Sequence, residues 1–484
     1  MKEKLYSNFV IGLICIFVAF FAAIIIAKFA TLALLIIPVL IAVILLAFFI
    51  FKNPELGWFL IVFFLPFERV PTVNFAGVDI KINTVIGFIT LFAWVLALMF
   101  SHKKFKVQPN ALTIPLSLFV IAMLLSLTHA VALDRAIQVL VFILFTMALG
   151  ILAVNMVYSK GILKKTLMVL FASSFLVGVF GLFQFGGDVV GLPASVTLLK
   201  SGYGSAVFGF PRIQAFSMEP LYLANYLLIP IGVGLALFFS KVDIPLKRWW
   251  LVGLLVLLLV NFILTVSRGG YLGLIGTFLV IGVFLFQRVF TWKNILIGLA
   301  TIGIVGYGVL FALNKGEARS VGEFLGHIQL QDFTRGESIE GRIRTFRHAL
   351  NAWKESPIFG QGIGNYGPWN LHYPNATPRE GWDIVNNQYI ELLAETGLVG
   401  MIAYSLLLMV LIFRSFIAFK YASDQFYKAV LVGLLAALIG ILIQYNFLST
   451  LYIIHIWILI GMLVGVQNII LKTRMTKPEI RKNY

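Results

Sequence analysis

Two arginines lie where long apolar segments meet, and their side chains suit the binding of an anion. Arg268 sits between two apolar segments, and Arg212 precedes another one. No acidic residue is near Arg268 in the sequence, and the adjacent Gly269 and Gly270 place no side chains beside it. A guanidinium is a planar fork of N–H donors that matches phosphate oxygens two at a time. We therefore interpret Arg268 as an anion-binding residue. An interfacial arginine held by headgroups or a salt bridge remains the alternative for both.

A carboxylate and a proline follow Arg212 at the start of the next apolar segment. Glu219 in the first turn of a helix complements the helix dipole, and Pro220 is tolerated at the first helical position. The pair therefore predicts a helix start. The alternative is that Glu219 orients Arg212 or engages the acceptor of a transfer reaction.

One polar island, Asn314 to Glu395, interrupts the apolar chain and is rich in Arg, Gly, Asn, Pro and Trp. Its spacing predicts a helix over 340–355 with one apolar and one basic face. The apolar residues are Ile343, Phe346, Leu350 and Trp353. The polar residues on the opposite face are Arg344, Arg347, His348 and Asn351. This basic face either binds a ligand or meets solvent and lipid headgroups, and both interpretations remain open.

The rest of the island carries further polar candidates. The segment 359–368 is predicted to be a loop, and no Gly-Lys-Ser/Thr follows its glycines to make a phosphate loop. His372 lies in the loop tip, where an exposed histidine is more often structural than catalytic. A second helix is predicted to begin near Val385, with a polar face at the outer boundary of the membrane. That face, which an ordinary polar helix end also explains, holds Asn387, Glu391 and Glu395.

Long apolar helices must position these residues. Hydrophobic residues make up 60% of the 484 and charged residues 12%, against roughly 25% charged in soluble domains. Runs of about 20 apolar residues cross a bilayer as helices, because lipid leaves an open sheet without hydrogen-bond partners. We predict an all-α polytopic membrane protein with about 14 transmembrane helices (12–14) and a large, partly helical outer-face loop between spans 11 and 12. The predicted spans are 9–27, 30–51, 57–67, 82–101, 111–128, 136–157, 166–185, 220–240, 249–266, 270–287, 294–313, 396–413, 428–447 and 451–471.

The third of these segments, 57–67, is the weakest prediction because it is short. It is either re-entrant or continues through Pro66 towards Val73. From these spans we divide the chain into four parts. They are 1–313 with spans 1–11, 314–395 as the outer loop, 396–471 with spans 12–14, and 472–484 as a basic cytoplasmic tail.

The net charge of +17 reflects topology and not a nucleic-acid surface. If the N-terminus lies in the cytoplasm and the spans alternate, the whole basic excess falls on the inner face. This is the positive-inside bias, and it attracts anionic lipid. It places both chain ends in the cytoplasm and the island outside. Cys15 is the single cysteine, and no Asp-x-Asp or His-Glu-x-x-His motif lies outside, so we expect neither a disulfide framework nor a metal site.

The order of these parts resembles the O-antigen ligase and polymerase superfamily of bacterial cell-surface glycan assembly. The resemblance covers roughly 205–415, and the first six predicted spans carry no motif that matches it. It rests on Arg212 before one span and on Ser267-Arg268-Gly269-Gly270-Tyr271-Leu272 at the start of another. Next come Arg342, Trp353, Pro357, Gly360, Gly362, Gly364 and Asn365 in the island, then Asn387, Ile390, Glu395, Gly397, Leu398 and Gly400 into the following span.

Proteins of this kind move a glycan from an undecaprenyl diphosphate carrier to an acceptor sugar, on the outer face of the bacterial inner membrane. They use no nucleotide sugar, metal or other cofactor. The resemblance implies that Arg212 and Arg268 grip the diphosphate, helped by Arg344 and Arg347 of the basic helix. Stabilising the charge of the leaving diphosphate drives displacement at the anomeric carbon. The implied partners are the lipid-linked donor, a lipid-linked or polymeric glycan acceptor and membrane lipids, with no nucleic acid.

The chain departs from the family where a His-Asn pair is usual, because Asn386-Asn387 stands there. Asparagine cannot take a proton at neutral pH, although it can hydrogen-bond an acceptor hydroxyl. We predict that Asn386 positions the acceptor together with Asn387 and Glu391. Either His372 or Glu219 replaces the missing base, or leaving-group stabilisation alone suffices, or this member of the family is impaired. The catalytic candidates are therefore Arg212, Arg268, Asn386, Glu219 and His372.

Two further questions stay open at the level of sequence. A ligase transfers to a lipid-linked core sugar and a polymerase to another repeat unit, and Glu219-Pro220 favours the polymerases. The alternative in a different class is a polysaccharide flippase or transporter whose outer loop is a gate. Against it stand the size of the loop and the lack of convincing inverted repeats.

Overall fold

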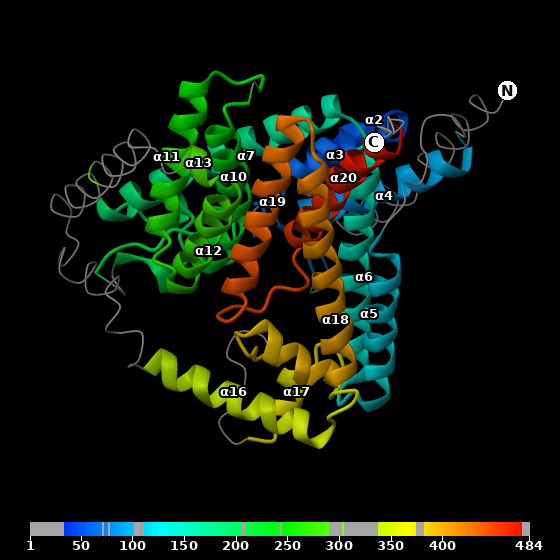
Figure 1. Cartoon of the computed structure of the whole chain (residues 1–484). Coiled ribbons are helices and arrows are strands. Elements are labelled where there is room, and N and C mark those ends of the chain that lie inside the picture. Colours follow the sequence, from blue (N-terminus) through cyan, green and yellow to red (C-terminus); the bar gives the residue numbers. More distant parts are fainter. Residues whose placement is uncertain are drawn as a thin grey trace.

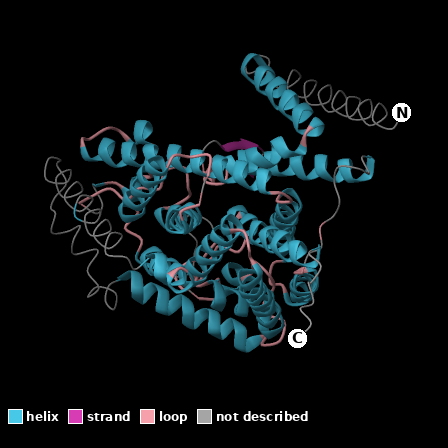
Figure 2. Ribbon diagram, turned by 45° about the horizontal axis from the view of Figure 1, so that its top comes forward, coloured by secondary structure: helices cyan, strands magenta, loops and turns pink. Residues whose placement is uncertain are grey.

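The computed structural model describes ten stretches of the chain. The described residues are 33–69, 72–75, 78–100, 108, 111–205, 209–242, 244–289, 303, 337–373 and 382–476. The predicted spans 9–27 and 294–313 lie outside these residues, apart from position 303, as does most of the basic tail. Within the described part the chain is almost wholly helical, as Figures 1 and 2 show. This confirms the helical fold class.

Seven of the described helices are long and apolar enough to cross a membrane. They are α4 (Ile82–Phe100), α6 (Leu133–Met156), α7 (Lys160–Val189), α10 (Pro220–Ser240), α18 (Gln388–Tyr421), α19 (Gln425–Gln444) and α20 (Ile454–Thr476). The other helices in the apolar segments are α2 (Ala33–Lys52), α3 (Pro54–Phe63), α5 (Thr113–Ser126), α11 (Arg248–Leu264) and α12 (Arg268–Phe284). Short turns of helix are η1 (Leu127–His129), α8 (Ala194–Thr197), η2 (Ser201–Tyr203) and α13 (Phe286–Val289). The full count of fourteen spans stays a prediction.

The third predicted span, 57–67, does not continue as a helix towards Val73. Helix α3 stops at Phe63, and the chain then forms an antiparallel hairpin of β1 (Thr72–Phe75) and β2 (Val78–Lys81). Continuation as a helix through Pro66 towards Val73 is therefore wrong. Pro66 lacks the N–H that a continuing helix needs, and the β-branched Thr72 and Val73 favour strand. The hairpin is the magenta element in Figure 2.

Helices α10, α12 and α19 pack at close range in the middle of the molecule. A Cβ atom placed on Gly273 of α12 would lie 2.7 Å from the carbonyl oxygen of Gly440 in α19. Such small-residue contacts let two backbones approach closely in a membrane protein. The N-terminal end of α12, where Arg268 is the first helical residue, is thereby fixed beside the C-terminal end of α19.

Helix α18 is broken near its N-terminal end. Asn387 caps its first turn by accepting hydrogen bonds from the N–H groups of Tyr389 and Ile390, both at 3.1 Å. Gly397 then has φ 63° and ψ −165°, which a residue with a side chain rarely adopts. A Cβ atom there would also lie 2.3 Å from the carbonyl oxygen of Ile358. The outer part of α18, before Gly397, therefore belongs to the island.

The island packs as a small helical layer below the bundle in Figure 1. It contains α16 (Glu337–Glu355), α17 (Tyr366–Asn370) and the outer part of α18. The helix predicted over 340–355 is confirmed, but its predicted apolar stripe is wrong in part. Ile343 and Leu350 are 44% and 37% exposed, while Ala349 and Ala352 are fully buried. Small side chains face the neighbouring helix because they allow close packing there.

Candidate active site at the start of α12

Arg212 is bound to the turn that precedes Arg268. Its Nη2 donates a hydrogen bond to the carbonyl oxygen of Val266 at 3.1 Å, and its Nε donates to that of Thr265 at 3.4 Å. Val266 has φ 47°, a strained conformation for a β-branched residue. Ser267 then caps α12, its hydroxyl accepting from the N–H of Gly270 at 3.1 Å. Arg212 thus helps to hold the backbone that carries Arg268.

Three arginines gather at this place, and Arg268 is the central one. It lies within electrostatic range of both Arg212 and Arg342 of α16. Burial lowers the pKa of Arg212 from its ordinary value, and the charge of Arg268 lowers it further while Glu219 opposes the shift. Burial and Arg268 likewise lower the pKa of Arg342. Arginines stay charged despite such shifts, so the cluster concentrates positive charge and attracts an anion.

The two glycines beside Arg268 do not leave the open backbone that the sequence suggested. Both are buried. A Cβ atom on Gly269 would lie 2.7 Å from Cβ of Phe447, and one on Gly270 would lie 2.9 Å from Cβ of Ala224. Their role is to let α10 and the loop after α19 approach α12. That loop carries Phe447, whose ring centroid lies 5.9 Å from Cζ of Arg342.

Glu219 stands at the start of α10, as predicted. Its carbonyl oxygen accepts from the N–H groups of Tyr222 and Leu223, both at 3.1 Å, and Pro220 occupies the first helical position. The side chain makes no capping hydrogen bond to its own helix. It is half-buried and lies within electrostatic range of Arg212. The helix-start interpretation is confirmed, and the carboxylate also lies near the arginine cluster.

The residues around Asn386 hold the loop 445–453 between α19 and α20. Asn386 has φ 57°, a left-handed conformation that asparagine tolerates well. Asn387 spends its side-chain oxygen on the cap of α18, and its Nδ2 donates to the carbonyl oxygen of Asn446 at 3.4 Å. Gln388 accepts from the N–H groups of Thr450 and Leu451 at 2.7 and 2.8 Å. The loop that bears Phe447 is thus fixed to the island.

Three predicted residues lie on the outward side of the island. Arg344 and Arg347 are exposed on α16, on the face opposite to Arg342. His372 is exposed after α17, with its Nδ1 2.6 Å from the carbonyl oxygen of Trp369. The structure therefore brings together Arg212, Arg268 and Glu219, and adds Arg342 to them. It does not bring Arg344, Arg347 and His372 into that cluster.

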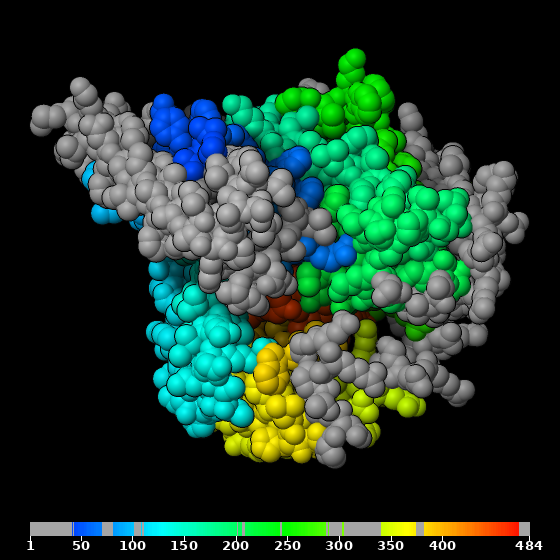
Figure 3. Space-filling model, turned by 180° about the vertical axis from the view of Figure 1, so that it is seen from behind, coloured from blue at the N-terminus to red at the C-terminus, as the bar shows by residue number. Residues whose placement is uncertain are grey.

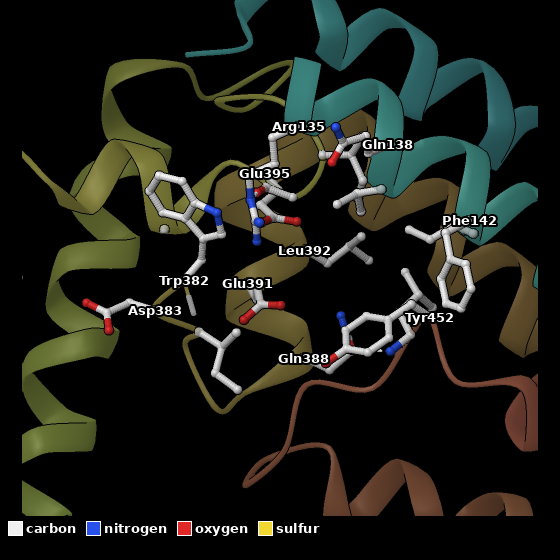
Figure 4. Close-up of a pocket in the computed structure, with 17 residues that line it drawn as sticks. Arg135, Gln138, Phe142, Trp382, Asp383, Gln388, Glu391, Leu392, Glu395 and Tyr452 are labelled. Atoms are coloured by element: carbon white, nitrogen blue, oxygen red, sulfur yellow. Dashed lines mark hydrogen bonds between the residues drawn. The ribbon is translucent and has the colours of Figure 1, made fainter. Parts of the chain in front are cut away.

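A cavity of about 560 Å³ opens at the N-terminal ends of α6 and α18. Figure 4 shows Arg135 of α6 projecting towards Glu391 and Glu395 of α18, between Trp382 and Tyr452. Glu391 and Glu395 share one face, as their spacing predicted, and both are buried. Sequence reasoning missed Arg135. Its position at the outer start of an apolar segment, like that of Arg268, was the available signal.

The segment 359–368, predicted as a loop, is a loop only as far as Asn365, because Tyr366–Pro368 belong to α17. The glycine-rich part forms one wall of this cavity. The side-chain oxygen of Asn365 accepts from the N–H of Ala132 at 2.6 Å. The N–H of Ile363 donates to the hydroxyl of Ser126 at 3.1 Å. Gly362 has φ 96° and lies against Ala130, where a Cβ atom would come within 2.7 Å. The loop is thereby docked on the outer turn between α5 and α6.

The middle of the chain is similar to a known protein family. Residues 253–405 match the O-antigen ligase family, and this match confirms the resemblance to the O-antigen ligase and polymerase superfamily. The matched region contains Arg268, Arg342, Glu391 and Glu395 but not Arg212. A Haemophilus influenzae protein described as uncharacterized is 28% identical over 169 residues. The aligned segment covers 33% of this chain and 41% of the length of the relative.

Proposed function

Because residues 253–405 are of the O-antigen ligase type, we propose that the protein is a membrane glycosyltransferase. It moves a glycan from undecaprenyl diphosphate to an acceptor sugar on the outer face of the bacterial inner membrane. The protein is multi-pass, with both termini in the cytoplasm and the island in the periplasm. The observation that carries the proposal is the gathering of Arg212, Arg268 and Arg342 at the outer end of α12.

The arginines act on the leaving group. A hydroxyl oxygen of the acceptor attacks the anomeric carbon, a new glycosidic bond forms, and the bond from that carbon to the diphosphate oxygen breaks. Undecaprenyl diphosphate leaves with the bonding electrons. Donors that are already in place where this charge develops lower the barrier without reorganising. Arg268 at the first turn of α12 adds its charge to the partial positive charge of the helix N-terminus.

Arg212 and Arg342 flank Arg268, and their roles differ. Arg212 spends two of its donors on the backbone before Arg268, so it positions the site as well as adding charge. Arg342 belongs to the island, so it closes the site from the outside. Arg344 and Arg347 face outwards and remain proposed contacts to the carrier, where they attract the anionic diphosphate as it approaches.

The proton of the acceptor hydroxyl needs a destination. Glu219 is the best placed of the sequence candidates, because it is half-buried and near Arg212. His372 is exposed and lies beside Trp369 in the island. Asn386 cannot take the proton but keeps its proposed role in orienting the acceptor hydroxyl. We therefore assign Glu219 as the base that accepts this proton and releases it to water.

The proposal is tested by incubating the purified protein with a lipid-linked oligosaccharide and candidate acceptors. Transfer to a lipid-linked core sugar by single additions indicates a ligase, and a ladder of products indicates a polymerase. EDTA should leave the transfer rate unchanged, since the proposed chemistry uses the arginines and Glu219 and needs no metal ion. Movement of the lipid across vesicles without bond formation would instead support a flippase.

A further inference from the structure

The cavity at the N-terminal ends of α6 and α18 has the size and lining of a sugar site. Its volume of about 560 Å³ lies inside the range of about 300–1,000 Å³ usual for small-molecule sites. In Figure 3 the surface is hollowed between the cyan atoms of α5 and α6 and the yellow atoms of the island. Trp382 and Tyr452 supply aromatic surface, and Gln138 and Gln388 supply amide groups. Aromatic rings pack against the C–H face of a sugar while polar groups bind its hydroxyls.

The charges inside the cavity are arranged around Arg135. Its Nε donates to the carbonyl oxygen of Gly364 at 2.6 Å, and its Cζ lies 5.1 Å from the ring centroid of Trp382. Glu391 and Glu395 lie within electrostatic range of it. Each glutamate also accepts a backbone hydrogen bond, Glu391 from Val385 at 2.8 Å and Glu395 from Tyr366 at 3.1 Å. Their carboxylates are therefore held in place before any ligand arrives.

This charge pattern selects among sugars. Burial raises the pKa of both glutamates, that of Glu395 to about 8, so the pair keeps one proton at neutral pH and its single negative charge offsets Arg135. Asp383 also lines the cavity, so an acidic sugar would meet a further carboxylate and no unbalanced cation. A neutral sugar offers hydroxyl protons that carboxylates accept strongly. The cavity thus fits an uncharged, hydroxyl-rich residue.

The cavity is connected to the arginine cluster through tyrosines. Tyr452 lines the cavity, and its hydroxyl lies 3.2 Å from that of Tyr222 in α10. Both tyrosines lie within electrostatic range of Glu219, which is itself in range of Arg212. The loop 445–453 runs between the two places, with Phe447 against Gly269 and Tyr452 in the cavity. Glu219 does not line the cavity itself, and the Tyr222–Tyr452 pair lies between the cavity and this proposed base.

We infer that this cavity, built around Arg135, Trp382, Glu391, Glu395 and Tyr452, binds a neutral sugar residue of the glycan acceptor. The inference rests on the proposed transfer function, and it assigns the donor diphosphate and the acceptor to opposite sides of the loop 445–453.

The test uses a soluble acceptor fragment that cannot occupy the diphosphate site. The probes are the core oligosaccharide freed from lipid A and the repeat-unit oligosaccharide freed from its lipid diphosphate. Binding to the whole detergent-purified protein is measured by saturation-transfer NMR and calorimetry. Trp382→Ala should weaken binding of the acceptor fragment about tenfold or more, because it removes aromatic surface from the cavity. The variant should still fold, because Trp382 is 41% exposed and lies outside the helices. Glu391→Gln keeps an oxygen for the N–H of Val385 and should also weaken it.

The controls separate this inference from the proposed function. Trp249→Ala removes a 60%-exposed tryptophan at the far end of α11 and should leave binding unchanged. Arg268→Ala should abolish transfer and leave binding of the fragment intact. If the wild-type protein binds neither probe, or if Trp382→Ala and Glu391→Gln bind as the wild type does, the inference is overturned. A rise in KM for the lipid-linked donor alone would also overturn it. Failure of transfer with normal fragment binding would count against the proposed function only.

Discussion

The Nη2 atom of Arg212 donates to the carbonyl oxygen of Val266 at 3.1 Å, two residues before Arg268. One arginine thus holds the turn from which another enters α12. The strained φ of 47° at Val266 lies at this contact. Strain of this kind persists only where the surroundings impose it, and it is common at functional sites.

Arg268→Ala should lower glycan transfer at least about 100-fold while the protein still inserts and folds. Arg268→Lys should be nearly as poor, because a point charge lacks the two-pronged geometry that matches a phosphate. Transfer is measured with the lipid-linked donor in vesicles, and folding by thermal unfolding. Arg248→Ala is the matched control, since Arg248 is exposed at the opposite end of α11. Full activity in the Arg268→Ala protein would refute the diphosphate assignment.

The three arginines of α16 provide a comparison within one helix. Arg342 faces the cluster, so Arg342→Ala should reduce kcat/KM for the donor about tenfold or more. Arg344→Ala and Arg347→Ala should each reduce it by about threefold or less at physiological salt, because exposed charges are screened. The measurement is the donor dependence of the initial rate. The reverse order would mean that the outward face of α16 holds the diphosphate.

Glu219→Gln should lower kcat about 100-fold and leave KM for the donor unchanged, because an amide cannot take the acceptor proton. His372→Ala should retain nearly full activity, since the imidazole is exposed. Steady-state kinetics of both variants, measured with donor and acceptor, decide whether Glu219 or His372 is the base. A raised KM for the donor in Glu219→Gln, without a fall in kcat, would show that the carboxylate only orients Arg212.

Gly397→Ala should destabilise the protein by about 2 kcal/mol or more. Its positive φ is unfavourable for a residue with a side chain, and the added methyl group would meet the carbonyl of Ile358. Gly253→Ala in α11 is the control, because no atom lies within 4 Å of a Cβ atom there. That change should be neutral or stabilise by up to about 1 kcal/mol. Thermal unfolding in detergent compares the two, and equal melting temperatures would contradict the packing described at the break in α18.

The sequence was sufficient to locate elements whose ends are set by neighbouring residues. The segment predicted over 220–240 is α10 itself, because Glu219-Pro220 starts the helix. The break at Gly397 was not predictable from its own segment. It depends on the approach of Ile358, which is distant in the chain.

Site residues were predictable where their own position in the sequence was unusual. Arg268 stood out because it lies between apolar segments without a nearby acid in the sequence. Arg342 lies in the cluster and Arg344 does not, because of which face of α16 packs inwards. That face carries the small, buried Ala349 and Ala352 and not the larger Ile343 and Leu350. Arg135 is more than 200 residues from Gly364, whose carbonyl it binds, so only the folded chain brings them together.

The loop 445–453 borders the arginine cluster with Phe447 and the cavity with Tyr452. If each place holds one substrate, both substrates lie against the same short segment of backbone. Thermodynamic linkage then makes the coupling reciprocal. If bound carrier changes the affinity for the acceptor sugar by some factor, bound sugar changes the affinity for the carrier by the same factor. A nine-residue partition of this kind lets the occupancy of one place change the affinity of the other.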